Sequence, residues 1–345
     1  MTGRRRALGT TVTLAHGGGG RAMHDLIDEV FVRRFGSAAG REDQARLPLA
    51  DLHALGDRLA FTTDSYVVDP LFFPGGDIGT LAVNGTINDL AMGGAVPVAL
   101  SCAIIAEEGL PIDVLERIAE SMRRAAAAAG VSIVTGDTKV VNRGAADKLF
   151  INTSGIGVIA AAIDIRAERA CPGDAVLVSG FLGDHGATIL NARGDLALDA
   201  AIESDTRCLH GLVQAMLAVC PDIHCMRDAT RGGLATVVNE FAQASGVGIV
   251  LNEEGLPIRE AVRGVCAILG LDPLYFANEG KLVAVVPGES AERVLSAMRA
   301  HPAGLDGAII GSIKAGPPGL VTLRTRFGGE RVLDTLIGEQ LPRIC

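Results

Sequence analysis

The sequence is poor in several features that often reveal a function. It contains no tryptophan, only 3% aromatic residues and no two cysteines in a Cys-x-x-Cys pattern, so a structural zinc site is not expected. Its longest apolar stretch, residues 95–106, is well short of the ~20 residues that span a bilayer, and we expect no membrane partner. The arginines at residues 4–6 are not followed by an apolar segment, so we expect no secretory signal.

Charge and cysteine content narrow the cellular setting. The formal net charge of −9 argues against nucleic acid as a partner, but it permits a nucleotide, whose phosphates can bind backbone N–H groups and a metal ion. Seven cysteines, an odd number without paired spacing, are typical of a protein in a reducing cytoplasm. Six lie in apolar or periodic segments and are interpreted as small buried side chains, namely Cys102, Cys171, Cys208, Cys220, Cys225 and Cys266. The seventh, Cys345, is the last residue.

The chain is long enough for two domains with separate cores. Apolar spacing predicts helices over Ile78–Met92 and Ile112–Ala129, and β-branched runs around them predict strands, so the fold class is mixed α/β. A second unit begins with a strand after Pro172, and a helix is predicted over Asp205–Ala218. The expected parts are a flexible Gly-rich arm and helix at residues 1–36, a first domain at 37–165, a second domain at 166–326 and a flexible tail at 327–345.

Four aspartates in Gly- and Thr-rich surroundings are the strongest chemical signal. They are Asp64 in TTDS, Asp89 in INDL, Asp137 in TGDT and Asp228 in RDATRGG. Carboxylates are ligands that Mg²⁺ prefers, usually with phosphate oxygens completing the coordination, and nearby glycines let a backbone approach phosphates closely. Each aspartate alone is more often a turn residue or a helix cap. Together, and with Asp89 inside an apolar helix pattern, they predict a site for magnesium and a phosphorylated ligand.

The usual phosphate-binding loops are absent. There is no Walker-type motif and no Gly-x-Gly-x-x-Gly after a strand. The run Gly17–Gly20 is followed by neither lysine nor serine, and the sequence leaves open whether it is a mobile arm or a lid that faces phosphates.

These motifs resemble a known superfamily. FTTD, VNGTINDLAMGGAVP, TGDT and RDATRGG are similar to the signature shared by aminoimidazole ribonucleotide synthetase, selenophosphate synthetase and thiamine-monophosphate kinase. Within that superfamily, LAHGGGG, FTTDSYVVDPLFFPGGDIG, TGDTKVV, DKLFINTSGIG, SGFLGDHGATIL, NEGKL and the terminal PRIC resemble the hydrogenase maturation family HypE, the carbamoyl dehydratases. The resemblance runs nearly from end to end. Four consecutive glycines in the arm, where the family more often has a Gly-Ser-Gly-Gly-like run, are a mild departure.

The resemblance implies the fold and the ligands. It implies a two-domain α/β fold of the aminoimidazole ribonucleotide synthetase type and a homodimer whose first domains, which bind ATP, pair their sheets into a β-barrel. ATP would lie between the domains and across the dimer contact. By motif, Asp64, Asp89, Asp137 and Asp228 would bind Mg²⁺ and the triphosphate, and Asn88 and Gly136 would line the site. Asp43 matches a further acidic position of the family more loosely and is included as a metal ligand.

The resemblance also implies a reaction and partners. The carbamoyltransferase HypF would load a carbamoyl group onto Cys345, ATP would activate it for dehydration to a thiocyanate, and a HypC–HypD complex that holds iron would accept the cyanide. A flexible tail permits the cysteine to reach all three sites, because lengthening a loose loop costs little entropy. We expect Glu279 to act as the base and Lys139 to stabilise charge on the carbamoyl oxygen. Without the resemblance, a turn carboxylate and a surface ion pair would be favoured for these two residues.

Two alternatives stay open at this level. Another enzyme of the superfamily is the first, although a selenophosphate synthetase would carry a reactive cysteine in its arm and this chain has none before Cys102. The second is a non-catalytic scaffold that delivers a group to a partner complex. The intact acidic motifs argue against a scaffold.

Overall fold

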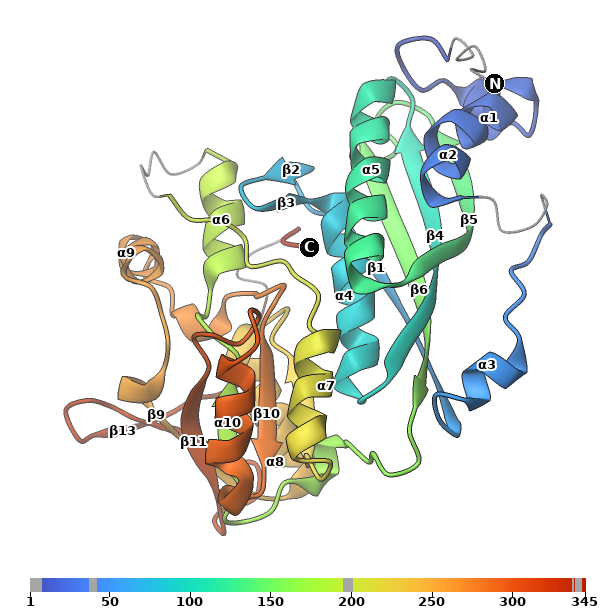
Figure 1. The fold of residues 1–345 in the computed structure, drawn as a ribbon. Coiled ribbons are helices and arrows are strands. Elements are labelled where there is room, and N and C mark those ends of the chain that lie inside the picture. Colours follow the sequence, from blue (N-terminus) through green and yellow to red (C-terminus); the bar gives the residue numbers. More distant parts are fainter. Residues whose placement is uncertain (1–7, 37–41, 195–200, 337, 339–342) are drawn as a thin grey trace.

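Two β-sheets, one in each half of the chain, organise the protein (Figure 1). The computed structural model describes residues 8–36, 42–194, 201–336, 338 and 343–345. The start of the expected arm and most of the expected tail after residue 336 therefore lie outside the described residues. Among the described residues, no helix has both the length and the apolar character that crossing a bilayer requires.

The first sheet has four strands in the order β1-β6-β4-β5. Strands β4 and β5 are parallel, and the other neighbours are antiparallel. Helices α4 (Ile78–Met92) and α5 (Ile112–Ala129) have the predicted bounds, and Gly130 ends α5 in the left-handed conformation that glycine accepts. The strands are β1 (Arg58–Tyr66), β4 (Val96–Glu107), β5 (Ser132–Val141) and β6 (Leu149–Ile159).

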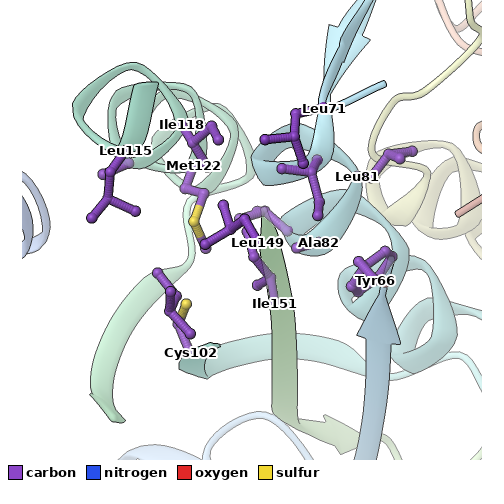
Figure 2. Close-up of a cluster of buried hydrophobic side chains, with 14 of the residues drawn as sticks. Tyr66, Leu71, Leu81, Ala82, Cys102, Leu115, Ile118, Met122, Leu149 and Ile151 are labelled. Atoms are coloured by element: carbon purple, nitrogen blue, oxygen red, sulfur yellow. The ribbon is translucent and has the colours of Figure 1, made fainter. Parts of the chain in front are cut away.

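Helices α4 and α5 cover one face of this sheet and form the first core with it. Met122 and Ile118 of α5 and Leu81 of α4 meet Ile151 of β6 there (Figure 2). Helix α4 is buried on nearly every side because it also contacts α7 and β8 of the second half. That position explains why its last turn can carry Asn88 and Asp89 inside an apolar pattern.

The opposite face of the first sheet is not covered by any described part of the chain. Leu59 and Phe61 of β1 are 63% and 71% exposed, and Ile105 of β4 is 41% exposed. Large apolar side chains gathered on one open sheet face are typical of a surface that another protein covers.

The amino-terminal arm packs against β5, the edge of the first sheet. It comprises a short 3₁₀ turn η1 (Leu14–Gly17), helix α1 (Arg21–Leu26), a π-helical turn η2 (Ile27–Val32) and α2 (Arg33–Phe35). A Cβ on Gly17 would lie 2.8 Å from the backbone nitrogen of Val140, so only glycine permits this contact. The glycine run therefore begins against β5. The short elements α3 (Leu49–His53), β2 (Phe72–Phe73) and β3 (Gly76–Asp77) complete the first half.

The second sheet has seven strands in the order β13-β12-β9-β11-β7-β10-β8. Helices pack on both of its faces, and β8 is the edge nearest α4. Its strands are β7 (Ala175–Val178), β8 (Cys225–Asp228), β9 (Gly248–Asn252), β10 (Leu282–Val286), β11 (Ala308–Lys314), β12 (Val321–Arg324) and β13 (Glu330–Val332). Its helices are α6 (Asp184–Ala192), α7 (His210–Val219), α8 (Gly233–Ser245), α9 (Glu260–Leu269) and α10 (Ala291–Arg299), with 3₁₀ turns at Ala167–Arg169, Glu253–Gly255, Pro273–Tyr275 and Gly288–Ser290.

Three sequence-based expectations require correction. The helix expected from Asp205 begins at His210, because the polar segment before it forms a loop that packs inward. Strand β13 lies within the range expected for the flexible tail, so the second sheet extends beyond residue 327. All seven cysteines are free, but Cys171 is exposed and Cys208 is partly exposed, whereas Cys102, Cys220, Cys225 and Cys266 are buried as predicted.

Candidate active site

Three of the predicted aspartates meet where the two halves of the chain touch. Asp64 comes from β1, Asp89 from the last turn of α4 and Asp228 from the end of β8. The hydroxyl of Thr62 donates to Asp89 Oδ2 at 2.9 Å. Arg231 lies 3.7 Å from Asp64 and is the cation nearest that carboxylate among the described ion pairs.

The electrostatics of this group show that the carboxylates repel one another. Burial, followed by the Asp89 and Asp64 carboxylates, raises the pKa of Asp228 to about 7. Burial also raises the pKa of Asp89, with a smaller contribution from Asp64 and an opposing one from the Thr62 hydrogen bond. Buried carboxyls whose pKa is raised by burial and by neighbouring carboxylates form a site suited to a divalent metal ion.

Glycines in the RDATRGG segment hold the Asp228 turn in place. Gly232 and Gly233 both have positive φ angles, 74° and 58°. A Cβ on Gly233 would lie 2.6 Å from the carbonyl oxygens of Leu274 and Phe276, so this position requires glycine. The turn leads directly into α8 and thereby fixes Arg231 beside the aspartates.

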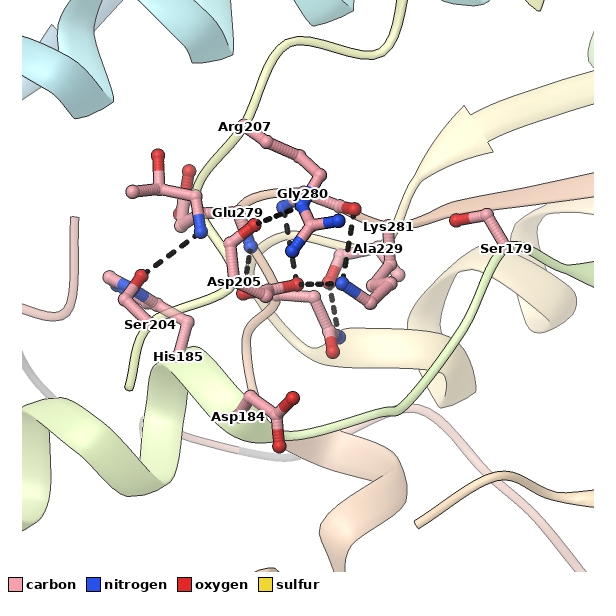
Figure 3. A network of polar contacts seen from close by, with 12 residues as sticks. Ser179, Asp184, His185, Ser204, Asp205, Arg207, Ala229, Glu279, Gly280 and Lys281 are labelled. Carbon is pink, nitrogen blue, oxygen red and sulfur yellow. Dashed lines mark hydrogen bonds and ion pairs between the residues drawn. The ribbon is translucent and has the colours of Figure 1, made fainter. Parts of the chain in front are cut away.

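Glu279 is the fourth carboxylate of the cluster and lies in the loop before β10 (Figure 3). It is only 4% exposed, and its Oε1 atom has no hydrogen-bond partner among the residues that the structure describes. Burial, then the Asp205, Asp228 and Asp64 carboxylates, raises the pKa of Glu279 well above its ordinary value. A buried carboxyl with a raised pKa and a free oxygen is suited to exchange protons with a bound ligand.

Buried polar groups fix the backbone around Glu279. Asp205 accepts the N–H of Glu279 at 3.0 Å and that of Gly280 at 3.2 Å, and Lys281 Nζ lies 3.2 Å from it. Burial opposes ionisation of Asp205, but the Lys281 ammonium and these N–H groups hold its pKa below the usual range. A Cβ on Gly280 would lie 1.9 Å from the Asp205 carbonyl oxygen, so the NEGKL motif needs its glycine.

Asn88, expected to line the ligand site, instead supports the loops beside it. Its amide nitrogen donates to the carbonyl of Arg207 at 3.0 Å, and its oxygen accepts the N–H of Leu209 at 2.7 Å. The side chain is 1% exposed. Asn88 thus joins α4 to the loop that carries Asp205.

The last three residues lie beside the acidic cluster, between the two halves of the chain (Figure 1). The N–H of Val67 donates to the carbonyl of Cys345 at 3.1 Å, and that of Asp69 to the carbonyl of Arg343 at 3.4 Å. The end of the chain therefore runs along residues 67–69 like an added strand. Ile344 is buried in the first core.

The charges of the acidic cluster act on the Cys345 thiol. Burial, then the Glu279 carboxylate, raises the pKa of the Cys345 thiol far above its ordinary value, while Arg231 opposes that effect. The structure therefore brings Cys345, Glu279, Asp64 and Asp228 together. The thiol is protonated in this position.

The remaining predicted residues form a second group on the arm side of β5. Asp43, Gly136 and Asp137 line a cavity of about 710 Å³ between β5 and the amino-terminal helices, together with the apolar residues Ile27, Phe31, Val32, Phe35 and Ile133. Lys139 is 62% exposed and lies 3.0 Å from Asp137. Gly136 is required because a Cβ there would lie 2.3 Å from the carbonyl oxygen of Cys102.

Within one chain the arm-side group of residues lies far from the acidic cluster. Strands β1 and β5 are opposite edges of the first sheet, and paired residues connect Asp137 through Ala103 and Asn152 to Ser65, the neighbour of Asp64. Three strand spacings of ~4.8 Å amount to roughly 14 Å between these levels of the two strands. Within the described chain, Asp137 and Lys139 therefore do not join Asp64, Asp89 and Asp228.

Sequence reasoning did not single out four buried or half-buried polar residues of this region, namely His185, Arg193, Asp205 and Lys281. His185 Nε2 lies 2.8 Å from the carbonyl oxygen of Ile344, and Arg193 donates to the carbonyl of Arg343 at 2.7 Å. A sequence signal existed for Asp205, because Ser204 and Thr206 beside it favour a turn and the apolar helix spacing begins only at Leu209.

Comparison with known proteins decides the family. Models of the amino-terminal and carboxy-terminal domains of AIR synthase related proteins match residues 42–159 and 171–323. Carbamoyl dehydratase HypE of Rhodobacter capsulatus is 58% identical over 334 residues, covering 97% of this chain and 98% of the relative. This chain belongs to the HypE family of carbamoyl dehydratases. The identification confirms the predicted family and enzyme class and excludes the other enzymes of the superfamily.

Solved structures of HypE proteins share the fold. A crystal structure of hydrogenase maturation protein HypE in complex with ATP has a TM-score of 0.92 and 51% identity, covering 97% of this chain and all of that one. The matched chain of a crystal structure of a HypE–HypF complex has a TM-score of 0.79 and 46% identity, covering 90% of this chain and 99% of that one. The predicted two-domain α/β fold is thereby confirmed.

Proposed function

We propose that this chain works as a homodimer that uses ATP and Mg²⁺ to dehydrate a carbamoyl group on its own Cys345 to a thiocyanate. The observation that supports this most is the docked end of the chain, which brings the Cys345 thiol beside Glu279 in a group of acidic residues. A terminal cysteine among carboxylates is a poor thiolate nucleophile, because burial and negative charge disfavour ionisation. The same surroundings suit a cysteine that carries a neutral group to a base.

The proposed chemistry has four changes of bonding. The γ-phosphoryl group of ATP is transferred to the carbamoyl oxygen, which turns that oxygen into part of a good leaving group. The nitrogen loses its two protons, the C–O bond breaks with release of phosphate, and a C≡N bond on the sulfur remains. Glu279 accepts one proton from nitrogen through its Oε1 atom, and the second proton leaves with the released phosphate. ADP and phosphate are the other products.

Asp64, Asp89 and Asp228 fit the magnesium site. Burial and then the neighbouring carboxylates raise the pKa of Asp228, and a bound cation would offset both by favouring the ionised form. Mg²⁺ would supply charge neutralisation to the transferring phosphoryl group. We assign Asp43 and Asp137 to the same metal and nucleotide site, approached from the arm-side cavity, whose apolar residues suit an adenine ring.

In the proposed dimer, residues of the arm-side group of one protomer would lie close to the acidic cluster of the other. A barrel formed by two copies of the first sheet would bring edge strand β5 of one protomer beside edge strand β1 of the other. The exposed Leu59, Phe61 and Ile105 support such pairing, since it would cover them. The partner subunit's Asp137 and the partner subunit's Lys139 would then complete the site formed by Asp64, Asp89, Asp228 and Glu279. Lys139 would stabilise charge on the carbamoyl oxygen.

The proposed partners follow from the route of the cysteine. A HypF carbamoyltransferase would load Cys345, and a HypC–HypD complex that holds iron would accept the cyanide. The domain limits proposed above change in one respect, because β13 moves the start of the tail to about residue 334.

Intact-mass measurement tests the proposed function. Protein incubated with the loading partner should gain the mass of one carbamoyl group, and addition of Mg–ATP should then remove the mass of one water. A Cys345→Ala variant should show neither change and should still be stabilised by Mg–ATP, by roughly 2.7 kcal/mol at 100 times the Kd. A carbamoyl group that maps to Cys171 or Cys208 would refute the role of the terminal cysteine.

A further inference from the structure

One short loop contacts the base directly and the docked end of the chain through His185. This loop comprises residues 204–209 and leads into α7 (Figure 3). On one side, Asp205 binds the N–H groups of Glu279 and Gly280 and forms the buried ion pair with Lys281. The backbone position of Glu279 therefore depends on the loop.

On its other side the loop contacts His185, which is fully buried in the first turn of α6. A carbonyl oxygen can only accept, so His185 Nε2 carries the hydrogen that is donated to Ile344 at 2.8 Å. In the neutral ring Nδ1 then accepts, and the Ser204 hydroxyl at 2.8 Å is its donor. Burial lowers the pKa of His185, which favours this neutral form.

The Ser204 hydroxyl is itself held by the loop. The N–H of Thr206 donates to Ser204 Oγ at 3.2 Å, and the Ser204 N–H donates to the carbonyl of Pro74 at 2.9 Å. The hydrogen-bond chain from Ile344 through His185 to Ser204 thus ends one residue from Asp205. The other described hydrogen bonds and ion pairs of the chain end, with Val67, Asp69, Asp147 and Arg193, do not lead to Glu279.

We propose that Ser204, Asp205 and His185 are positioning residues that set the Cys345 sulfur and the Glu279 carboxylate in register for dehydration. Adjacent residues of one loop act on both groups, Asp205 on Glu279 directly and Ser204 on the chain end through His185. His185 acts on the carrier and Asp205 on the base. The inference rests on the proposed roles of Cys345 and Glu279, and the first test below is independent of those roles.

The first test measures how long the chain end stays docked. Cys345 is protected in the docked position, whereas Cys171 is exposed and serves as an internal reference in the same molecule. The alkylation rates of the two thiols by iodoacetamide are followed by peptide mass spectrometry. Replacing His185 by Phe removes one hydrogen bond and should raise the Cys345/Cys171 rate ratio about fivefold.

Matched variants sharpen this test. His185→Gln keeps an N–H donor near the position of Nε2 and should stay within about twofold of the parent. Alkylation of the buried Cys220 and Cys225 would show that His185→Phe has lost its fold, in which case Ser204→Ala, which removes only a hydroxyl, decides the matter. An unchanged Cys345/Cys171 ratio in the folded variant overturns the proposal.

The second test asks whether the loop acts on chemistry. Protein that already carries the carbamoyl group is mixed with Mg–ATP, and loss of water is timed in a single turnover. His185→Phe and Asp205→Asn should slow this step at least about tenfold, while His185→Gln restores most of the rate. Loading by the transferase should not be slowed, because it needs the undocked tail. Equal slowing of loading and dehydration would indicate a merely structural role. If Cys345 is alkylated as expected but never dehydrated in the parent, the proposed function fails and the docking role stands.

Discussion

The base side and the lysine side of the proposed active site differ in how completely one chain builds them. Glu279 is buried and is held in place because its own N–H and that of Gly280 donate hydrogen bonds to Asp205. Lys139 is 62% exposed on an edge strand, with Asp137 as its ion-pair partner. The difference teaches that one chain holds Glu279 and Cys345 in place by itself, whereas Asp137 and Lys139 lie on the opposite edge of the first sheet, which the proposed second protomer would bring near.

The base side should be the most sensitive to a single change. Glu279→Gln keeps the shape of the side chain but removes its ability to accept a proton, so dehydration of loaded Cys345 should fall by roughly 10²–10⁴-fold. Loading and Mg–ATP stabilisation should remain. The single-turnover rate by intact mass is the measurement, and a fall of less than threefold would exclude Glu279 as the base.

The lysine side can be tested by complementation between subunits. Asp137→Asn and Asp228→Asn homodimers should each be inactive, but a heterodimer purified through two different tags should recover about half of the parent activity, because one of its two sites then carries neither substitution. An Asp89→Asn/Asp228→Asn heterodimer is the control and should stay inactive, since each site keeps one defect. Failure of the first pair to recover would mean that Asp137 serves its own chain.

A substitution on the open face of the first sheet should dissociate the proposed dimer and so separate the base side of one protomer from the lysine side of the other. Phe61→Asp places an unpaired charge where the barrel would bury it, so the dimer should dissociate and dehydration should be lost with it. Phe327→Asp, at a position 86% exposed in the second domain, is the matched control and should leave both properties unchanged. Sedimentation velocity reports the dimer, and a dimeric, active Phe61→Asp protein would contradict the barrel.

A smaller effect should appear in the pH dependence of stability without metal. The pKa of Asp228 is about 7 in the folded chain, above its ordinary value of 3.8, so the folded state binds the proton more tightly than the unfolded state. Stability conferred by this group is then present below pH ~4 and is lost as pH rises toward 7, by up to about 1.4 kcal/mol per pH unit.

Asp228→Asn removes that dependence. In EDTA the variant should melt at a higher temperature than the parent at pH 8, and the difference should shrink toward pH 5. Thermal melts at the two pH values are the measurement. If the difference in melting temperature between variant and parent is the same at pH 8 and at pH 5, burial and the neighbouring carboxylates do not raise the pKa of Asp228 as described.

Local sequence patterns were enough to predict two helices and the family of this protein. Helices Ile78–Met92 and Ile112–Ala129 were predicted to the residue, because their apolar spacing agrees with their burial and glycines follow both ends. The family was evident from short motifs, several of which, such as RDATRGG and NEGKL, have a glycine that close backbone contact requires.

Only the tertiary structure decided how the acidic residues divide into two groups and which buried residues hold them in position. Nothing in the spacing of Asp64 and Asp137 tells that strand order puts them on opposite edges of one sheet, because strand order depends on contacts between segments far apart in sequence. Likewise the neighbours of Asp205, His185 and Lys281 in the chain do not tell what each of these residues contacts in the fold. They become important only because burial makes an unpaired polar group costly, which forces Asp205 onto Lys281 and the Glu279 loop and His185 onto the end of the chain.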